Sequence, residues 1–142
     1  MEGLGGIIAF AMGWLVAQMI KMFAVLTSSG RMSRKEAYAW FAKSCRGGGM
    51  PSGHTSSFVA LTIYIGCLQG FGSVIFALSA CMTVMVVYDA LNVRRSVGEI
   101  GQEMKRAGKI KKVAMGHTMS EVAAGAIVGA VVGWVTWIVL GG

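Results

Sequence analysis

Four long apolar runs constrain this chain more than any other feature. A helix needs about 20 mostly apolar residues to cross the hydrocarbon core of a bilayer. The runs lie at Leu4–Leu26, Thr55–Leu68, Gly72–Leu91 and Thr118–Leu140, and the second is the shortest. At 142 residues the chain has the length of a single domain. The sequence therefore predicts an all-α, single-domain membrane bundle of about four transmembrane helices, residues 1–142, with short interfacial helices on its basic side.

The positive charges gather between these runs. All 13 Lys and Arg residues except Lys21 fall in Arg31–Arg46 or Arg94–Lys112, two connections that the helix count places on one side of the membrane. Cytoplasmic loops carry an excess of Lys and Arg, so this side is predicted to be cytoplasmic and both termini to lie outside. The net charge of +7 then favours anionic lipid headgroups as partners, and four spans argue against nucleic acid.

Small residues recur every four positions in two of the runs. They are Gly5, Ala9, Gly13 and Ala17 in the first run, and Gly125, Gly129 and Gly133 in the last. This spacing lets helices approach closely in lipid, and it also permits a homodimer through the Gly-rich faces. Lys21 continues the first series, so it either faces the bundle interior or snorkels to the interface.

Two capping boxes of the form Ser-x-x-Glu stand in the basic connections. Ser33 with Glu36, and Ser96 with Glu99, each predict the start of a short helix. We expect both helices to lie in the headgroup layer, and Gly108 is a plausible stop for the second.

The stretch Gly-Gly-Met-Pro-Ser-Gly-His at 48–54 contains the only proline of the chain and precedes the second run. Its glycines allow close approach of the backbone to a ligand, and a helix N-terminus favours anions. Ser52, Gly53 and His54 are therefore candidates for a phosphate site. The alternative is structural, with Ser52 as a simple N-cap and His54 as an interface residue.

His117 and Glu121 are four residues apart at the start of the last run. If one helix includes both, they share a face. A carboxylate at Nδ1 fixes the imidazole tautomer and leaves Nε2 free to attack, as a nucleophile requires. Thr118-x-x-Glu121 is equally a capping box that needs no catalysis, so both interpretations stay open.

Asp89, Arg94 and Arg95 stand at the end of the third run. The guanidinium fork suits phosphate oxygens, and Asp89 is a candidate to orient one arginine. Alternatively, the arginines anchor the helix in anionic headgroups and Asp89 is a structural ion pair. The sequence has no cluster of Asp, Glu or His that a metal would require. Together, the two histidines, the carboxylate, the cations and the helix N-terminus favour phosphoryl transfer without a metal or cofactor.

Four motifs carry a family resemblance, in the order Gly48–Ser56, Val87–Ala90, Val93–Arg95 and Gly116–Val122. Together they resemble the small bacterial divergent branch of the type 2 phosphatidic-acid phosphatase and vanadium haloperoxidase superfamily, over nearly the whole chain. The resemblance implies hydrolysis of phosphate monoesters or diphosphates, often on lipids, through a phosphohistidine and without metal.

The resemblance also implies roles for single residues. His117 corresponds to the nucleophile, Glu121 replaces the usual Asp beside it, and His54 corresponds to the general acid. The superfamily's first motif, a Lys followed seven residues later by Arg-Pro, is missing, and Lys111 replaces an Arg six residues before the nucleophile. The candidate phosphate-binding residues are therefore Lys21, Lys43, Ser52, Gly53, Arg94 and Arg95.

The leading interpretation is a multi-pass lipid phosphatase of the bacterial cytoplasmic membrane. Its expected substrate is a lipid phosphomonoester of the inner leaflet, such as phosphatidylglycerophosphate. One alternative is a phosphatase for undecaprenyl or other polyprenyl (di)phosphates, working on the outer face. Another is a non-catalytic protein that binds anionic lipid, which would need the basic rim but neither histidine.

Overall fold

The structure is a computed structural model that describes residues 2–28, 49–110, 113 and 116–140. Within these ranges the chain forms helices joined by turns and contains no strand, which confirms the all-α prediction. The elements are α1 (Glu2–Ser28), α3 (Gly53–Gln69), α4 (Val74–Tyr88), the π-helical segment η1 (Asp89–Val93), α5 (Arg94–Arg106) and α6 (Met119–Leu140). The bounds of α1, α3 and α6 lie within two residues of the predicted ones.

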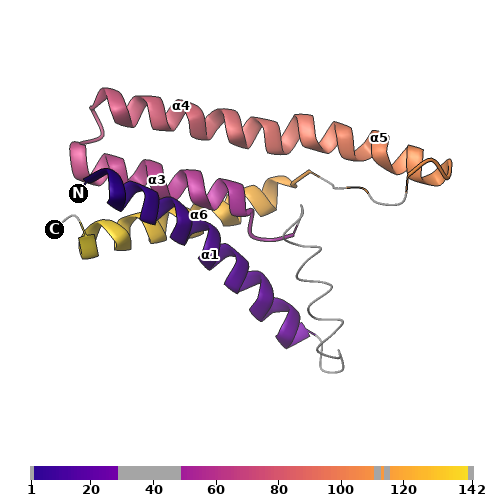
Figure 1. The fold of residues 1–142 in the computed structure, drawn as a ribbon, viewed down its shortest axis with the longest axis horizontal. Helices are drawn as coiled ribbons and strands as arrows, with labels where there is room; N and C mark the ends of the chain where they lie inside the picture. The colour runs from indigo at the N-terminus through magenta and orange to yellow at the C-terminus, as the bar shows by residue number, and fades with distance from the viewer. Residues whose placement is uncertain (1, 29–48, 111–112, 114–115, 141–142) are drawn as a thin grey trace.

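Three helices of the described part are long and apolar enough to cross a membrane, at Gly3–Thr27, Val74–Arg106 and Met119–Leu140. The helix α3 has 17 residues and is not among these three, in keeping with the second apolar run being the shortest of the four. It instead forms the centre of the bundle, where it contacts α1, α4 and α6 (Figure 1).

Small residues explain how α3 reaches this central place. The hydroxyl of Ser56, which is fully buried, donates to the Gly13 carbonyl of α1 at 2.8 Å. A methyl group on Gly13 or on Gly129 of α6 would lie 2.7 or 2.5 Å from the Ser56 carbonyl oxygen, so α1 and α6 both cross α3 at a separation that only glycine permits. The predicted small-residue packing is confirmed within the chain, and the homodimer stays a prediction.

The third apolar run does not end where the sequence suggested. It continues as one helical path from α4 through η1 into α5, so α5 begins at Arg94 rather than at the expected capping residue Ser96. Because the residues before Arg94 are already helical, α5 needs no side-chain cap. Figure 1 shows α5 extending the line of α4 beyond the rest of the bundle. The expected short helix at Ser33–Glu36 lies outside the described residues.

The ends of the bundle separate two sets of features. The start of α1, the end of α6 and the α3–α4 turn lie at one end, whereas the start of α3, the start of α6 and the α4–α5 junction lie toward the other (Figure 1). The fold therefore gathers the three chemistry-bearing motifs, which are far apart in the sequence, at a single end.

Candidate active site

The side chains of His117 and Glu121 form a closely packed pair at the start of α6. Nδ1 of His117 lies 3.0 Å from Oε2 of Glu121, and their side chains are 5% and 19% exposed. The Thr118 N–H donates to the same Oε2 at 3.0 Å, and the Glu121 N–H donates to the Thr118 hydroxyl at 3.4 Å. The capping box and the carboxylate–imidazole pair, two alternatives from the sequence, are therefore both present.

Glu121 also joins the two histidine motifs. Its second oxygen, Oε1, accepts the N–H of Gly49 at 3.2 Å, and its backbone carbonyl accepts the N–H of Ser52 at 2.9 Å. Gly49 has φ +86°, a conformation that favours glycine. A methyl group on Gly125 would lie 2.6 Å from the Ser52 carbonyl oxygen, so this glycine lets α6 approach the loop before α3.

The start of α3 leaves two backbone donors available. Ser52 is the N-cap, because its hydroxyl accepts the Thr55 N–H at 3.4 Å and its carbonyl accepts the Ser56 N–H at 3.0 Å. The N–H groups of Gly53 and His54 have no acceptor among the residues that the structure describes. Such groups at a helix N-terminus favour an anion. The phosphate role of Ser52 and Gly53 stays a prediction that these backbone donors support.

His54 stands in the first turn of α3, outside the three helices able to span a membrane. Its side chain is exposed at the surface of the site. Partial burial is the first cause that lowers the pKa of His54 from its ordinary 6.5, followed by the electrostatic effects of Arg94, His117 and Lys21, while Asp89 acts in the opposite direction.

The two adjacent arginines have different partners. Arg94 donates from Nε to Oδ2 of Asp89, so Asp89 orients this arginine as the sequence suggested. Arg95 donates to Glu99 at 3.3 Å on the exposed face of α5, where both side chains are more than half exposed. Of the pair, Arg94 is thus the one whose charge acts on His54.

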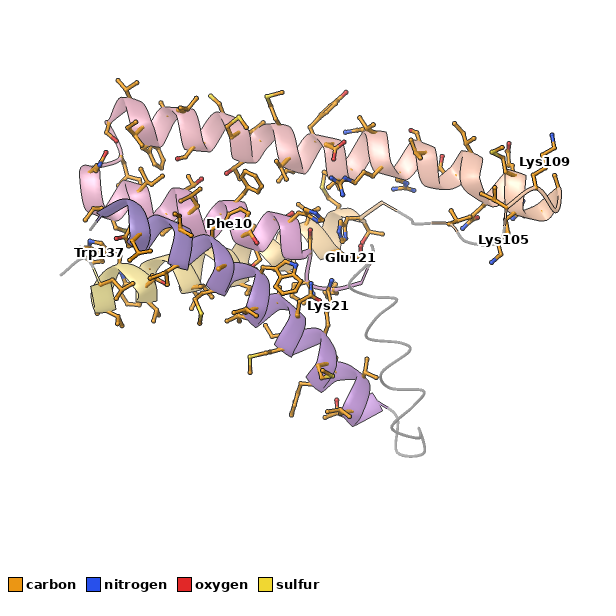
Figure 2. The ribbon with its side chains drawn as sticks, viewed as in Figure 1. Phe10, Lys21, Lys105, Lys109, Glu121 and Trp137 are labelled. Atoms are coloured by element: carbon orange, nitrogen blue, oxygen red, sulfur yellow. The ribbon has the colours of Figure 1, made fainter. Side chains whose placement is uncertain are left out.

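Lys21 lies in the interior of the bundle. It is 3% exposed, and a methyl group on Gly49 would lie 3.9 Å from its Cε. Of the two alternatives from the sequence, Lys21 therefore faces the interior of the bundle and does not snorkel to the interface. Figure 2 draws Lys21 and Glu121 at the same end of the bundle, and Gly49, whose N–H donates to Glu121, lies beside the Lys21 side chain. The remaining candidate cation, Lys43, lies outside the described residues.

Sequence reasoning missed one part of the site, the contact between η1 and the residues before α6. The N–H of His117 donates to the carbonyl of Ala90 at 3.0 Å. A methyl group on Gly116 would overlap the backbone of Arg95, so this close contact requires glycine. A π-helical segment has no strong sequence signature, and the motif around Ala90 indicated a family but not a function for its backbone.

Comparison with known proteins identifies the family of this chain. The chain matches the Divergent PAP2 family over residues 5–132, a range that includes every candidate residue of the site. It belongs to the Divergent PAP2 family. Over 52 residues it is 42% identical to the "Uncharacterized membrane protein YuiD" of Bacillus subtilis (strain 168), a match that covers 37% of this chain. The aligned part spans about a third of that relative, 33% of its length. No solved structure shows a significant match.

A Divergent PAP2 protein is a membrane protein of a phosphatase-like family. Here the described residues provide the imidazole of His117, oriented by Glu121, and the exposed imidazole of His54. They also provide two backbone N–H groups at the start of α3 and the cations Lys21 and Arg94. No group of three His, Cys, Asp or Glu residues gathers as a metal site in the described ranges, and a metal-free reaction stays a prediction. The arrangement fits transfer of a phosphoryl group to a histidine.

Proposed function

We propose that this Divergent PAP2 protein hydrolyses a lipid phosphomonoester, phosphatidylglycerophosphate or a similar lipid, through a phosphohistidine formed on His117. The observation that carries the proposal is the 3.0 Å contact between Nδ1 of His117 and Glu121 beside the start of α3. The carboxylate holds the proton on Nδ1, so the lone pair is on Nε2, the atom that attacks. A membrane-embedded site favours a substrate that is itself anchored in the bilayer.

The first step transfers the phosphoryl group. Nε2 of His117 forms a bond to phosphorus, the bond from phosphorus to the lipid oxygen breaks, and His54 donates a proton to the departing alkoxide. Lys21, Arg94 and the open N–H groups at the start of α3 stabilise the charge on the phosphoryl oxygens. Glu121 stabilises the positive charge that develops on the imidazole ring of His117.

The second step regenerates the protein. Neutral His54 removes a proton from water, the water oxygen attacks phosphorus, and the nitrogen–phosphorus bond breaks to return the electron pair to His117. Inorganic phosphate leaves, and His54 is protonated again. Because one histidine starts neutral and the other protonated, we expect a bell-shaped dependence of kcat/KM on pH.

We further propose that the site faces the cytoplasm in a bacterial inner membrane. The support is the distribution of Lys and Arg, which concentrate in the two connections at the site end. A cytoplasmic site would act on a lipid phosphate made in the inner leaflet. A site on the opposite face would instead favour an undecaprenyl or other polyprenyl phosphate.

The test is activity of the purified protein in detergent on a panel of lipid phosphates. The panel contains phosphatidylglycerophosphate, phosphatidic acid, and undecaprenyl phosphate and diphosphate. We expect phosphate release from phosphatidylglycerophosphate or phosphatidic acid, and a loss of about 1,000-fold or more in His117→Ala, because the nucleophile is gone. Ser120→Ala, which changes an exposed residue on the same turn, is the matched control and should retain activity.

Each outcome has a distinct meaning. Activity of folded His117→Ala equal to that of the unmodified protein would overturn the nucleophile assignment. Hydrolysis of the undecaprenyl lipids alone would replace the proposed substrate class. If the unmodified protein binds anionic lipid but hydrolyses nothing on the panel, the protein is a binding protein and the proposal is wrong.

A further inference from the structure

The segment η1 changes the hydrogen-bond register of the long helix next to the site. In an α-helix the N–H of Arg94 would donate to the carbonyl four residues back, that of Ala90. Here it donates to the carbonyl of Asp89, five residues back, as in a π-helix. The carbonyl of Ala90 is thereby released from its α-helical partner and accepts the N–H of His117 at 3.0 Å.

The same register change explains the Asp89–Arg94 ion pair. Side chains three or four residues apart are neighbours on an α-helix, whereas residues five apart point in different directions. Asp89 and Arg94 are five apart, and yet Nε of Arg94 donates to Oδ2 of Asp89. The π-helical turn between them therefore brings both onto one face, with the charge of Arg94 acting on His54.

The contact between η1 and the His117 loop is close as well as hydrogen-bonded. A methyl group at Gly116 would overlap the backbone N–H of Arg95 and meet the carbonyl oxygen of Ala90. The backbone on both sides of the nucleophile is therefore fixed. The His117 N–H donates to the Ala90 carbonyl of η1, and the N–H of the next residue, Thr118, donates to the Glu121 carboxylate of α6.

We propose that η1 is the positioning element of this site. Its released Ala90 carbonyl sets the backbone of His117, while its wide turn keeps Arg94 paired with Asp89, so one extra residue in the helix positions the nucleophile without separating the cation from its partner. Ala90 is a positioning residue, since its carbonyl acts through His117. The inference rests on the proposed reaction at His117 for its kinetic effect, but the hydrogen bond is testable without any activity.

Deletion of Asn92 tests the proposal, because removing one residue converts a π-helical turn into an α-helical one. The Ala90 carbonyl would then accept the N–H of Arg95 within the helix, and Asp89 and Arg94 would become four apart and remain paired. We expect kcat to fall about 100-fold through misplacement of His117, with KM nearly unchanged because Arg94 is retained. Formation of the phosphohistidine should slow by the same factor.

The matched control is Asn92→Ala, which keeps the backbone length and removes only the side-chain hydrogen bond from Nδ2 to the Tyr88 carbonyl. It should retain the kcat of the unmodified protein. If the deletion variant has native helix content and the same kcat as Asn92→Ala, the proposal is wrong. A fall in kcat accompanied by an equal rise in KM would also count against it, because it would indicate general damage to the site.

Two further measurements apply if the deletion variant does not fold. Gly116→Ala leaves η1 intact and pushes His117 away from it, so kcat should again fall while KM is retained; unchanged kcat would overturn the proposal. In the unmodified protein, the amide of His117 should exchange its hydrogen slowly with solvent. Exchange at the rate of an unprotected amide would refute the Ala90 contact, even if the protein proved to have no phosphatase activity at all.

Discussion

Replacement of Glu121 by glutamine separates the charge of this residue from its hydrogen bonds. The carboxylate accepts three bonds, from His117 Nδ1 and the Thr118 N–H at 3.0 Å each and from the Gly49 N–H at 3.2 Å. A glutamine offers one acceptor oxygen and an NH₂ group that only donates. If the oxygen takes the position facing His117 and Thr118, the bond from Gly49 is lost, at about 1 kcal/mol, and the other two lose their charge assistance.

We therefore expect the free energy of unfolding to fall by only about 1–3 kcal/mol. The effect on catalysis should be much larger, because the positive charge that develops on the imidazole ring of His117 no longer faces a carboxylate. An Asp-to-Asn change at the analogous position of a serine-protease triad lowers kcat about 10⁴-fold, so we expect about a 10²- to 10⁴-fold loss here. The assay is steady-state phosphate release, with thermal unfolding measured on the same samples.

The control for this experiment is Glu103→Gln, which changes an exposed carboxylate on α5 by the same chemistry. It should alter neither kcat nor stability. The reasoning would be refuted if Glu121→Gln retained the kcat of the unmodified protein. It would also be refuted if the lost activity only followed the fraction of unfolded protein.

Other predictions address the fold, the electrostatics and the membrane orientation. Gly129→Ala should lower the free energy of unfolding by about 1–3 kcal/mol through overpacking against α3, whereas Gly3→Ala, where nothing lies within 4 Å of the new methyl group, should be neutral or stabilising in the same unfolding assay. Bound vanadate, an anion, should offset the nearby positive charges and raise the lowered pKa of His54, as followed by NMR titration; a pKa that does not move would count against an anion site there. In a chain with its native cysteines replaced, Lys109→Cys should react with a membrane-impermeant maleimide only after cells are opened, and labelling of intact cells would place the basic end outside.

Much of the fold could be predicted because it depends on local patterns. Apolar runs set the bounds of α1, α3 and α6, and the four-residue spacing of small residues identified the faces that pack on α3. The path after Tyr88 could not be predicted in the same way. Gly and Pro are absent between Val74 and Val97, so the sequence contains no stop signal, and the capping box at Ser96 indicated a helix start inside a helix that had already formed.

The candidate site shows a similar division. The pairing of His117 with Glu121 followed from helical spacing, and that of Asp89 with Arg94 from chemical complementarity. The sequence left open whether Glu121 would pair with the Thr118 backbone, as in a capping box, or with the imidazole of His117. Only the folded structure shows that one carboxylate oxygen contacts both groups. The backbone contacts of Gly49 and Ala90 were not predictable, since any residue carries an N–H and a carbonyl and only the tertiary fold selects which ones meet.

The central claim is that His117 is the nucleophile that accepts the phosphoryl group. His54 is the acid that protonates the leaving group and then the base that activates water. This claim is tested most directly by rapid quenching of the protein with a radiolabelled lipid phosphate, followed by isolation of phosphoprotein. We expect an acid-labile, base-stable label on His117 of the unmodified protein, label that forms and is hydrolysed more slowly in His54→Ala because both steps use His54, and none in His117→Ala. Two results would contradict the mechanism. One is substrate turnover with no label in the unmodified protein or in His54→Ala, and the other is label that persists in His117→Ala.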